Sequence, residues 1–354
     1  MTVAAMLKTV PLRGLSRQHL TLAALAVLTS ILMLSGLMLG PVSIGGAQLW
    51  AVLGGRGEPL DASIIWQIRL PRLVLGLAVG MALALSGSAL QGVLRNPLAD
   101  PGLIGITAGA SIGAVTAIVL GDLITPELPT LVQSFLLPLA AFLGSSLAMA
   151  CVFTLARQGG ETSVAMLILI GIAINTIAGA LIGVLVYVAD DQALRDLTFW
   201  SMGGLGHAGW PVVLVALGVT LAVIPVFWSQ ARGLDLFQLG ERQAFHAGLD
   251  VEHSKRRLAI SAALCVGAVT AAAGPIGFIG LVAPHLARLL IGHEHRWMLP
   301  AAALLGVSLV LAADLAVRLA IPPQEPPIGI ATSLIGGPFF LWLLTRRMGS
   351  IARA

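Results

Sequence analysis

Charged side chains are scarce in this sequence of 354 residues. Asp, Glu, Lys and Arg together make up 10% of the chain, whereas 57% of it is hydrophobic. A soluble domain usually carries roughly 25% charged residues. With so few, the chain could not solvate its own surface in water, and the composition therefore predicts a membrane-embedded protein.

Lysine is almost absent, since Lys8 and Lys255 are the only two. The formal net charge of +4 would fit a nucleic-acid partner. However, no basic stripe is interleaved with aromatic residues, as a nucleic-acid interface would require. Orientation in a bilayer explains the positive charge better, so we expect membrane lipid and no nucleic acid as a partner.

Catalytic and cofactor motifs are also lacking. Cys151 and Cys265 lie inside apolar runs, which argues against a disulfide framework or a metal site. The stretch "HEHRW" is not the zinc-binding HExxH, and neither lysine follows a glycine as in a phosphate-cradling GxxxxGK[ST] loop. We therefore expect no bound metal, no permanently bound cofactor and no ATP site in this chain.

Long apolar runs are what the sequence does contain. The first, residues 20–39, has 20 residues and lacks a small-x-small cleavage site, whereas a secretory h-region has about 7–15. It predicts a retained helix behind a cytoplasmic segment, residues 1–19. The whole chain, residues 1–354, is interpreted as one transmembrane domain of about ten helices, and the predicted spans are 20–39, 72–94, 103–120, 132–156, 163–188, 211–229, 258–273, 276–291, 299–320 and 329–345.

The distribution of positive charge predicts the orientation of these spans. With the N-terminus inside, 15 of the 20 Lys and Arg residues fall on the cytoplasmic side. This agrees with the positive-inside rule. The fold class is therefore an all-α polytopic membrane protein with both termini in the cytoplasm.

Glycines recur four residues apart within several spans. Such spacing lets helix backbones approach closely in lipid, and it predicts a compact bundle. The residues concerned are Gly76 and Gly80; Gly105, Gly109 and Gly113; and Gly179 and Gly183.

The energy source is the next question, because ion-coupled transporters normally keep ionisable groups within their spans. Asp314 is the one plausible mid-helix acid here, and Arg318 lies four residues later, close enough to pair with it. An external ATPase that docks on the long polar segment 230–257 accounts for the sequence better. An ion-coupled secondary transporter is the alternative, and a membrane enzyme is a more distant one.

Three stretches carry a family resemblance: "IRLPRLVLGLAVGMALALSGSALQGVLRNPLADPGLIGITAGASIGA", "AGPIGFIGLVAPHLARLL" and "PPIGIATSLIGGPFFLWLL". They resemble the FecCD-like permeases, which are subunits of type II ABC importers for iron chelates, haem and cobalamin. The resemblance implies a homodimer in the bacterial inner membrane. It also implies two cytoplasmic ATPase subunits, which bind ATP and Mg, and a periplasmic substrate-binding protein.

The cargo is less well defined by the resemblance. Residues 186–210, "VYVADDQALRDLTFWSMGGLGHAGW", resemble the haem-import branch more than the siderophore or cobalamin branches, which stay open as alternatives. Haem is therefore the expected substrate. Asn175 is a candidate for lining the path, with a structural amide satisfied by a neighbouring helix as the alternative.

The resemblance also implies site residues at both membrane surfaces. Arg69, Arg72 and Arg318 match arginines that bind glutamates of the binding protein, with interfacial snorkelling as the alternative. Such charges mainly set approach and register.

On the cytoplasmic side, Asn96 and Leu98 in "RNPLADPG" match one constriction of the inner mouth, and Thr162 and Ser163 match a second. The prolines of that motif stop the helix, and its Asn and Asp turn the chain, so a purely structural turn is the alternative.

The segment 230–257 matches the coupling helices that contact the ATPase. The expected coupling residues are Leu239, Gly240, Ala244, Gly248 and Leu249. A solvated loop is the alternative, although loops this long in compact proteins are usually functional.

Overall fold

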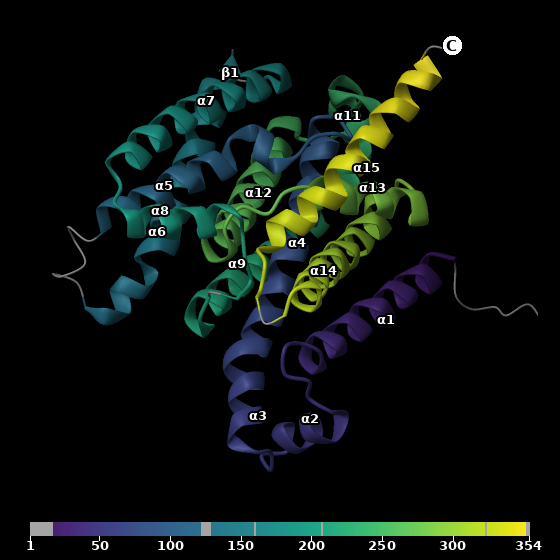
Figure 1. Ribbon diagram of the computed structural model, residues 1–354. Coiled ribbons are helices and arrows are strands. Elements are labelled where there is room, and N and C mark those ends of the chain that lie inside the picture. The colour runs from purple at the N-terminus through teal and green to yellow at the C-terminus, as the bar shows by residue number, and fades with distance from the viewer. Residues whose placement is uncertain (1–16, 122–128, 159–160, 207, 323, 352–354) are drawn as a thin grey trace, which may run out of the picture.

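The protein is a bundle of helices in its computed structural model, which describes residues 17–121, 129–158, 161–206, 208–322 and 324–351 (Figure 1). Every predicted span coincides with a helix over most of its length, whereas most of the predicted N-terminal segment lies outside the described residues. The helices are α1 (Arg17–Met38), α4 (Leu70–Val93), α5 (Ile106–Leu120), α6 (Thr130–Leu155), α7 (Val164–Val188), α9 (Trp210–Ser229), α12 (Val251–Ala273), α13 (Ile279–Ile291), α14 (His295–Ala320) and α15 (Ile328–Ile351).

Among the residues that the structure describes, seven helical segments are long and apolar enough to cross a membrane. Helices α5 and α13 and part of α15 are shorter apolar helices. In the described residues the strands are limited to β1 (Arg157–Gln158) and β2 (Glu161–Thr162). The predicted all-α polytopic membrane fold is confirmed, whereas the count of ten spans and the cytoplasmic termini stay predictions.

The second span begins earlier than the sequence predicted. A continuous helical run starts at Pro59 and comprises α3 (Pro59–Ser63), the π-helical η2 (Ile64–Arg69) and α4. Pro71, which cannot donate a backbone hydrogen bond, lies two residues after the π-helical segment, in the first turn of α4, where a proline is tolerated. Helix α4 thus matches the predicted span within two residues at its start, and the helical run extends beyond it toward the N-terminus.

The polar segment before the seventh span is also more helical than predicted. It contains α10 (Ala231–Leu239) and α11 (Glu241–His246), and α12 begins seven residues before the expected start at 258. The Asp250 side chain accepts a hydrogen bond of 3.0 Å from the backbone N–H of His253, and this cap starts α12. Lys255 consequently lies in a helix rather than in a loop.

Helix α4 forms the centre of the bundle, and α9, α12, α13 and α14 pack against it (Figure 1). Nearly all its residues from Pro71 to Val93 are buried. A Cβ at Gly80 would lie 2.5 Å from the Val307 Cα atom of α14, and a Cβ at Gly87 would lie 1.9 Å from the Gly280 carbonyl oxygen of α13. Only glycine permits these backbone contacts.

Close packing by glycine recurs between α5 and α6. A Cβ at Gly109 would lie 2.4 Å from the Gly144 carbonyl oxygen, and one at Gly113 would lie 1.9 Å from the Ala140 carbonyl oxygen. Gly179 and Gly183 differ, because a Cβ at either would meet nothing within 4 Å. The glycine spacing thus predicted real helix contacts, except on α7, where this face has no neighbour within the single chain.

Candidate cytoplasmic gate and coupling site

The predicted coupling residues lie around α11. Gly240 and Gly248 flank this helix with φ angles of +112° and +88°, in the left-handed region that favours glycine. Leu239 is exposed, Ala244 is fully buried and Leu249 is half-buried against the main core. Helix α11 is therefore a short segment held between two glycine joints.

The first predicted gate segment is a tight turn between α4 and η3 (Pro101–Ile104). The Asn96 side-chain oxygen accepts a hydrogen bond of 3.0 Å from the Leu98 N–H, and Asp100 accepts one of 2.8 Å from the Gly102 N–H. Burial raises the pKa of Asp100 above its ordinary value, and the Gly102 hydrogen bond only partly offsets this. The turn chemistry predicted from the sequence is confirmed, and a gating role stays a prediction.

The second predicted gate segment is fastened to α12. The Thr162 N–H donates a hydrogen bond of 3.0 Å to Glu252, and its hydroxyl also bonds this carboxylate. Its carbonyl accepts a hydrogen bond of 3.0 Å from the Lys255 ammonium group. Ser163 accepts one of 3.5 Å from the Met166 N–H and so caps α7. The N–H, hydroxyl and carbonyl groups of Thr162 are thus all hydrogen-bonded to side chains of α12.

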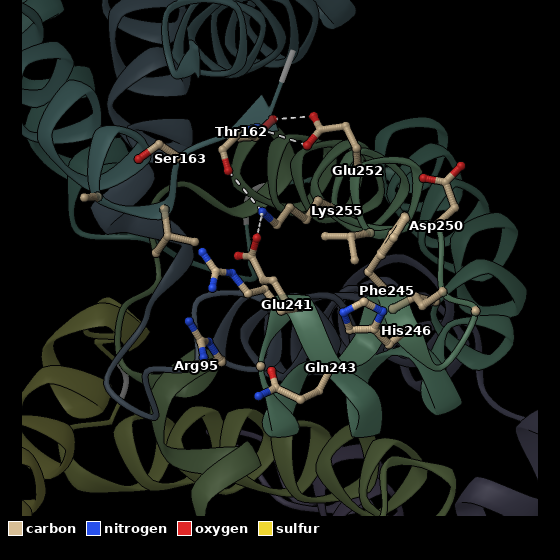
Figure 2. A pocket seen from close by; sticks show the side chains of 17 residues that line it. Arg95, Thr162, Ser163, Glu241, Gln243, Phe245, His246, Asp250, Glu252 and Lys255 are labelled. Carbon is tan, nitrogen blue, oxygen red and sulfur yellow. Dashed lines mark hydrogen bonds and ion pairs between the residues drawn. The ribbon is translucent and has the colours of Figure 1, made fainter. Parts of the chain in front are cut away.

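A cavity of about 1560 Å³ lies between α11 and the turn that contains Thr162 and Ser163 (Figure 2). It brings together residues that the sequence assigned to two different roles, namely the gate residues Thr162 and Ser163 and the coupling residues Gly240, Gly248 and Leu249. Asn96, Leu98, Leu239 and Ala244 are not among its lining residues.

The sequence reasoning missed the polar residues that connect the two regions. Glu241 of α11 and the Lys255 ammonium group form an ion pair of 2.7 Å, and Glu252 holds Thr162 from the other side (Figure 2). Glu252 and Lys255 are three residues apart, which places them on one face of a helix. This spacing becomes informative only once α12 is known to begin at Val251.

The three predicted docking arginines occupy a buried network near the C-terminal end of α14. The Arg72 Nε atom lies 2.8 Å from Asp314, and its guanidinium also pairs with Glu325. The Arg318 Nε atom lies 3.3 Å from the second oxygen of Asp314, as the spacing in the sequence predicted. Arg69 and Arg318 also donate to backbone carbonyls at the end of α1. Glu325 was missed because it lies beyond the helix, where no periodicity points to it.

Asn175 takes part in a structural contact. Its side-chain amide donates a hydrogen bond of 3.4 Å to the Gly102 carbonyl, which joins α7 to η3. This matches the structural alternative, and a role in lining the path stays a prediction. In the described residues, no three His, Cys, Asp or Glu side chains are grouped so that they could hold a metal ion.

Apolar helices packed around a buried central helix, with a cavity at one end that several charged residues line, are the architecture of a polytopic membrane protein. The chain belongs to the FecCD transport family, whose pattern matches residues 28–346. The family resemblance inferred from the sequence is confirmed.

Two curated relatives and one solved structure illustrate the similarity. The chain is 44% identical to the hemin transport system permease protein HmuU of Yersinia pestis, over 95% of this chain and 98% of the relative. It is 39% identical to the cobalamin import system permease protein BtuC of Halobacterium salinarum, over 96% and 90%. A solved structure described as an inward-facing conformation of a metal-chelate type ABC transporter matches with a TM-score of 0.81 and 32% identity, over 92% of this chain and 98% of that one.

Proposed function

We propose that this chain is the permease subunit of an ATP-driven ABC importer, and that it moves haem or a related iron chelate from the periplasm to the cytoplasm of a bacterium. The observation that carries the proposal is the 44% identity to a hemin permease over 95% of the chain. The similarity to cobalamin permeases keeps that cargo, and ferric siderophores, as the alternatives.

The partners follow from what this chain contains. The sequence contains no GxxxxGK[ST] phosphate-binding loop. In the proposed assembly, two separate ATPase subunits bind ATP and Mg and dock at α10 and α11. Leu239, the last residue of α10, is 65% exposed, and Phe245 of α11 is 67% exposed. Exposed apolar side chains beside a polar cavity suit a protein partner.

A second copy of the chain completes the pathway. The exposed face of α7 carries Gly179 and Gly183, and α15 carries Gly337, all with open space where a Cβ would lie. At Gly80, Gly87, Gly109 and Gly113, by contrast, the missing Cβ lets the backbone of another helix approach closely. Lipid packs less closely than a helix, so these faces suit a homodimer interface.

Cargo delivery requires a periplasmic binding protein. Arg69, Arg72 and Arg318 are the proposed docking residues, and all three are buried in the single chain. Docking would therefore exchange an internal carboxylate, such as Glu325, for a glutamate of the binding protein. The side chain of Glu325 is 38% exposed, which makes it the accessible member of the network.

The test is ATP turnover in a reconstituted complex. The permease and its candidate ATPase are assembled in lipid nanodiscs, and binding protein loaded with haem, a ferric siderophore or cobalamin is added. We expect haem-loaded protein to stimulate hydrolysis most. Stimulation by another ligand alone would refute haem as cargo, and no response to any binding protein would refute the importer assignment.

A further inference from the structure

Lys255 joins the coupling helix to the predicted gate through a continuous chain of polar contacts. We propose that Lys255 is a positioning residue, which transmits displacement of α11 to Thr162, while Glu252 fixes the other side of the same turn. The inference rests on the proposed function, because it needs α11 to be the helix that the ATPase moves.

The contacts run in series from one element to the next. The Lys255 Nζ atom lies 2.7 Å from the Glu241 carboxylate on α11 and 3.0 Å from the Thr162 carbonyl oxygen on β2. Figure 2 shows the ammonium group between these two partners, with Glu252 bonded to the opposite side of Thr162. A shift of Glu241 therefore acts on the gate turn through a single side chain.

Burial makes this link obligatory. The Lys255 side chain is 3% exposed, whereas that of Glu241 is 33% exposed. A buried ammonium group without a carboxylate is unfavourable, so Lys255 must follow Glu241 or lose its charge partner. Glu241 on α11 is the exposed member of the ion pair, so a docked ATPase can reach it.

Helix length, flanking glycines and burial favour movement of α11 rather than of α12. Helix α11 has six residues between Gly240 and Gly248, and backbones at glycine change direction at little steric cost. Helix α12 has 23 residues, most of them buried. The short helix is thus the mobile end of the link, and the long helix is its fixed support.

The receiving end is also connected to a membrane span. Thr162 is 3% exposed, and it is followed by Ser163, which caps α7. Displacement of the Thr162 carbonyl therefore acts directly on the first turn of α7. Since α7 carries the open glycine face, the same movement reaches the proposed dimer axis.

The test compares variants that keep or remove the link. Lys255→Met retains the apolar stem without the charge, Glu241→Gln removes the carboxylate, and Lys255→Arg keeps a cationic donor. Arg257→Met is the matched control, because Arg257 is exposed on the same helix and lines neither of the two cavities that Thr162 borders. Each permease is reconstituted with ATPase and haem-loaded binding protein in proteoliposomes.

We expect Lys255→Met and Glu241→Gln to hydrolyse ATP while haem imported per ATP falls about fivefold or more, within the range of coupling between sites. Lys255→Arg should restore most of the ratio, and Arg257→Met should match the wild type. An unchanged ratio in Lys255→Met and Glu241→Gln would overturn the proposal, as would an equal fall in Arg257→Met.

Hydrogen exchange of the permease alone separates this inference from the proposed function. Glu241→Gln should speed amide exchange at Thr162 and Ser163, although residue 241 touches neither. Unchanged exchange would overturn the link even if transport fails for another reason. If the wild-type complex ignores loaded binding protein while exchange responds as expected, the link stands and the importer assignment is the part refuted.

Discussion

Asp314 provides a stringent energetic test, because one carboxylate serves two buried guanidinium groups. Its oxygens lie 2.8 Å from Arg72 and 3.3 Å from Arg318, and all three residues are at most 6% exposed. Removing one partner of a buried ion pair typically costs about 3–5 kcal/mol. Since Arg72 keeps Glu325, we expect Asp314→Ala to cost about 3 kcal/mol, a change of roughly a hundredfold in the folded-to-unfolded ratio.

The matched control is Glu325→Gln, which alters the same network at its exposed edge. The Glu325 side chain is 38% exposed, and such pairs contribute about 0–1 kcal/mol. The assay is equilibrium unfolding in mixed micelles titrated with dodecyl sulfate, followed by tryptophan fluorescence. A loss in Asp314→Ala no larger than that in Glu325→Gln would refute the reasoning that the buried carboxylate compensates both arginines.

Three further predictions follow from packing, burial and the open glycine face. Gly87→Ala should destabilise the fold by about 1–3 kcal/mol in the same unfolding assay, because its Cβ would lie 1.9 Å from the Gly280 carbonyl oxygen. The control Gly218→Ala should be neutral or stabilising, because a Cβ at residue 218 would meet nothing within 4 Å. Equal losses in the two variants would refute the packing argument. Burial raises the pKa of Asp100 above its ordinary 3.8, so the folded state holds this proton more tightly than the unfolded chain. The free energy of unfolding should therefore fall as pH rises above about 4. Asp100→Asn, measured from pH 4 to 8, should remove that part of the pH dependence, and parallel curves for the variant and the wild type would contradict the argument. Gly179→Leu with Gly183→Leu should weaken the dimer in a detergent sedimentation assay while leaving monomer stability within about 0.5 kcal/mol, whereas an unchanged dimer would place the interface elsewhere.

The length of the apolar runs was sufficient to predict the membrane fold but not its helix boundaries. Each span is a long apolar run, and such runs must form helices in lipid because their backbone groups have no other partner. The start of α12 was missed because its first turns, around Lys255, are polar and resemble a loop, and only the Asp250 cap shows that the helix begins there.

The site was predictable in its parts and not in its connections. Motif resemblance indicated Thr162 and Gly240 separately, and the fold places both at one cavity. The link between them depends on Glu241 and Lys255, which are 14 residues apart in sequence, and on a contact with Thr162 across 93 residues. No local pattern encodes contacts of that range.

Haem uptake by proteoliposomes tests the central claim most directly, namely that this chain is a passive path driven by hydrolysis in another subunit. The permease is reconstituted alone, with a proton gradient, and in parallel with its ATPase, ATP and loaded binding protein. The account predicts uptake only in the complete assembly, abolished by vanadate and insensitive to an uncoupler. Uphill uptake by the permease alone on the ion gradient would contradict it.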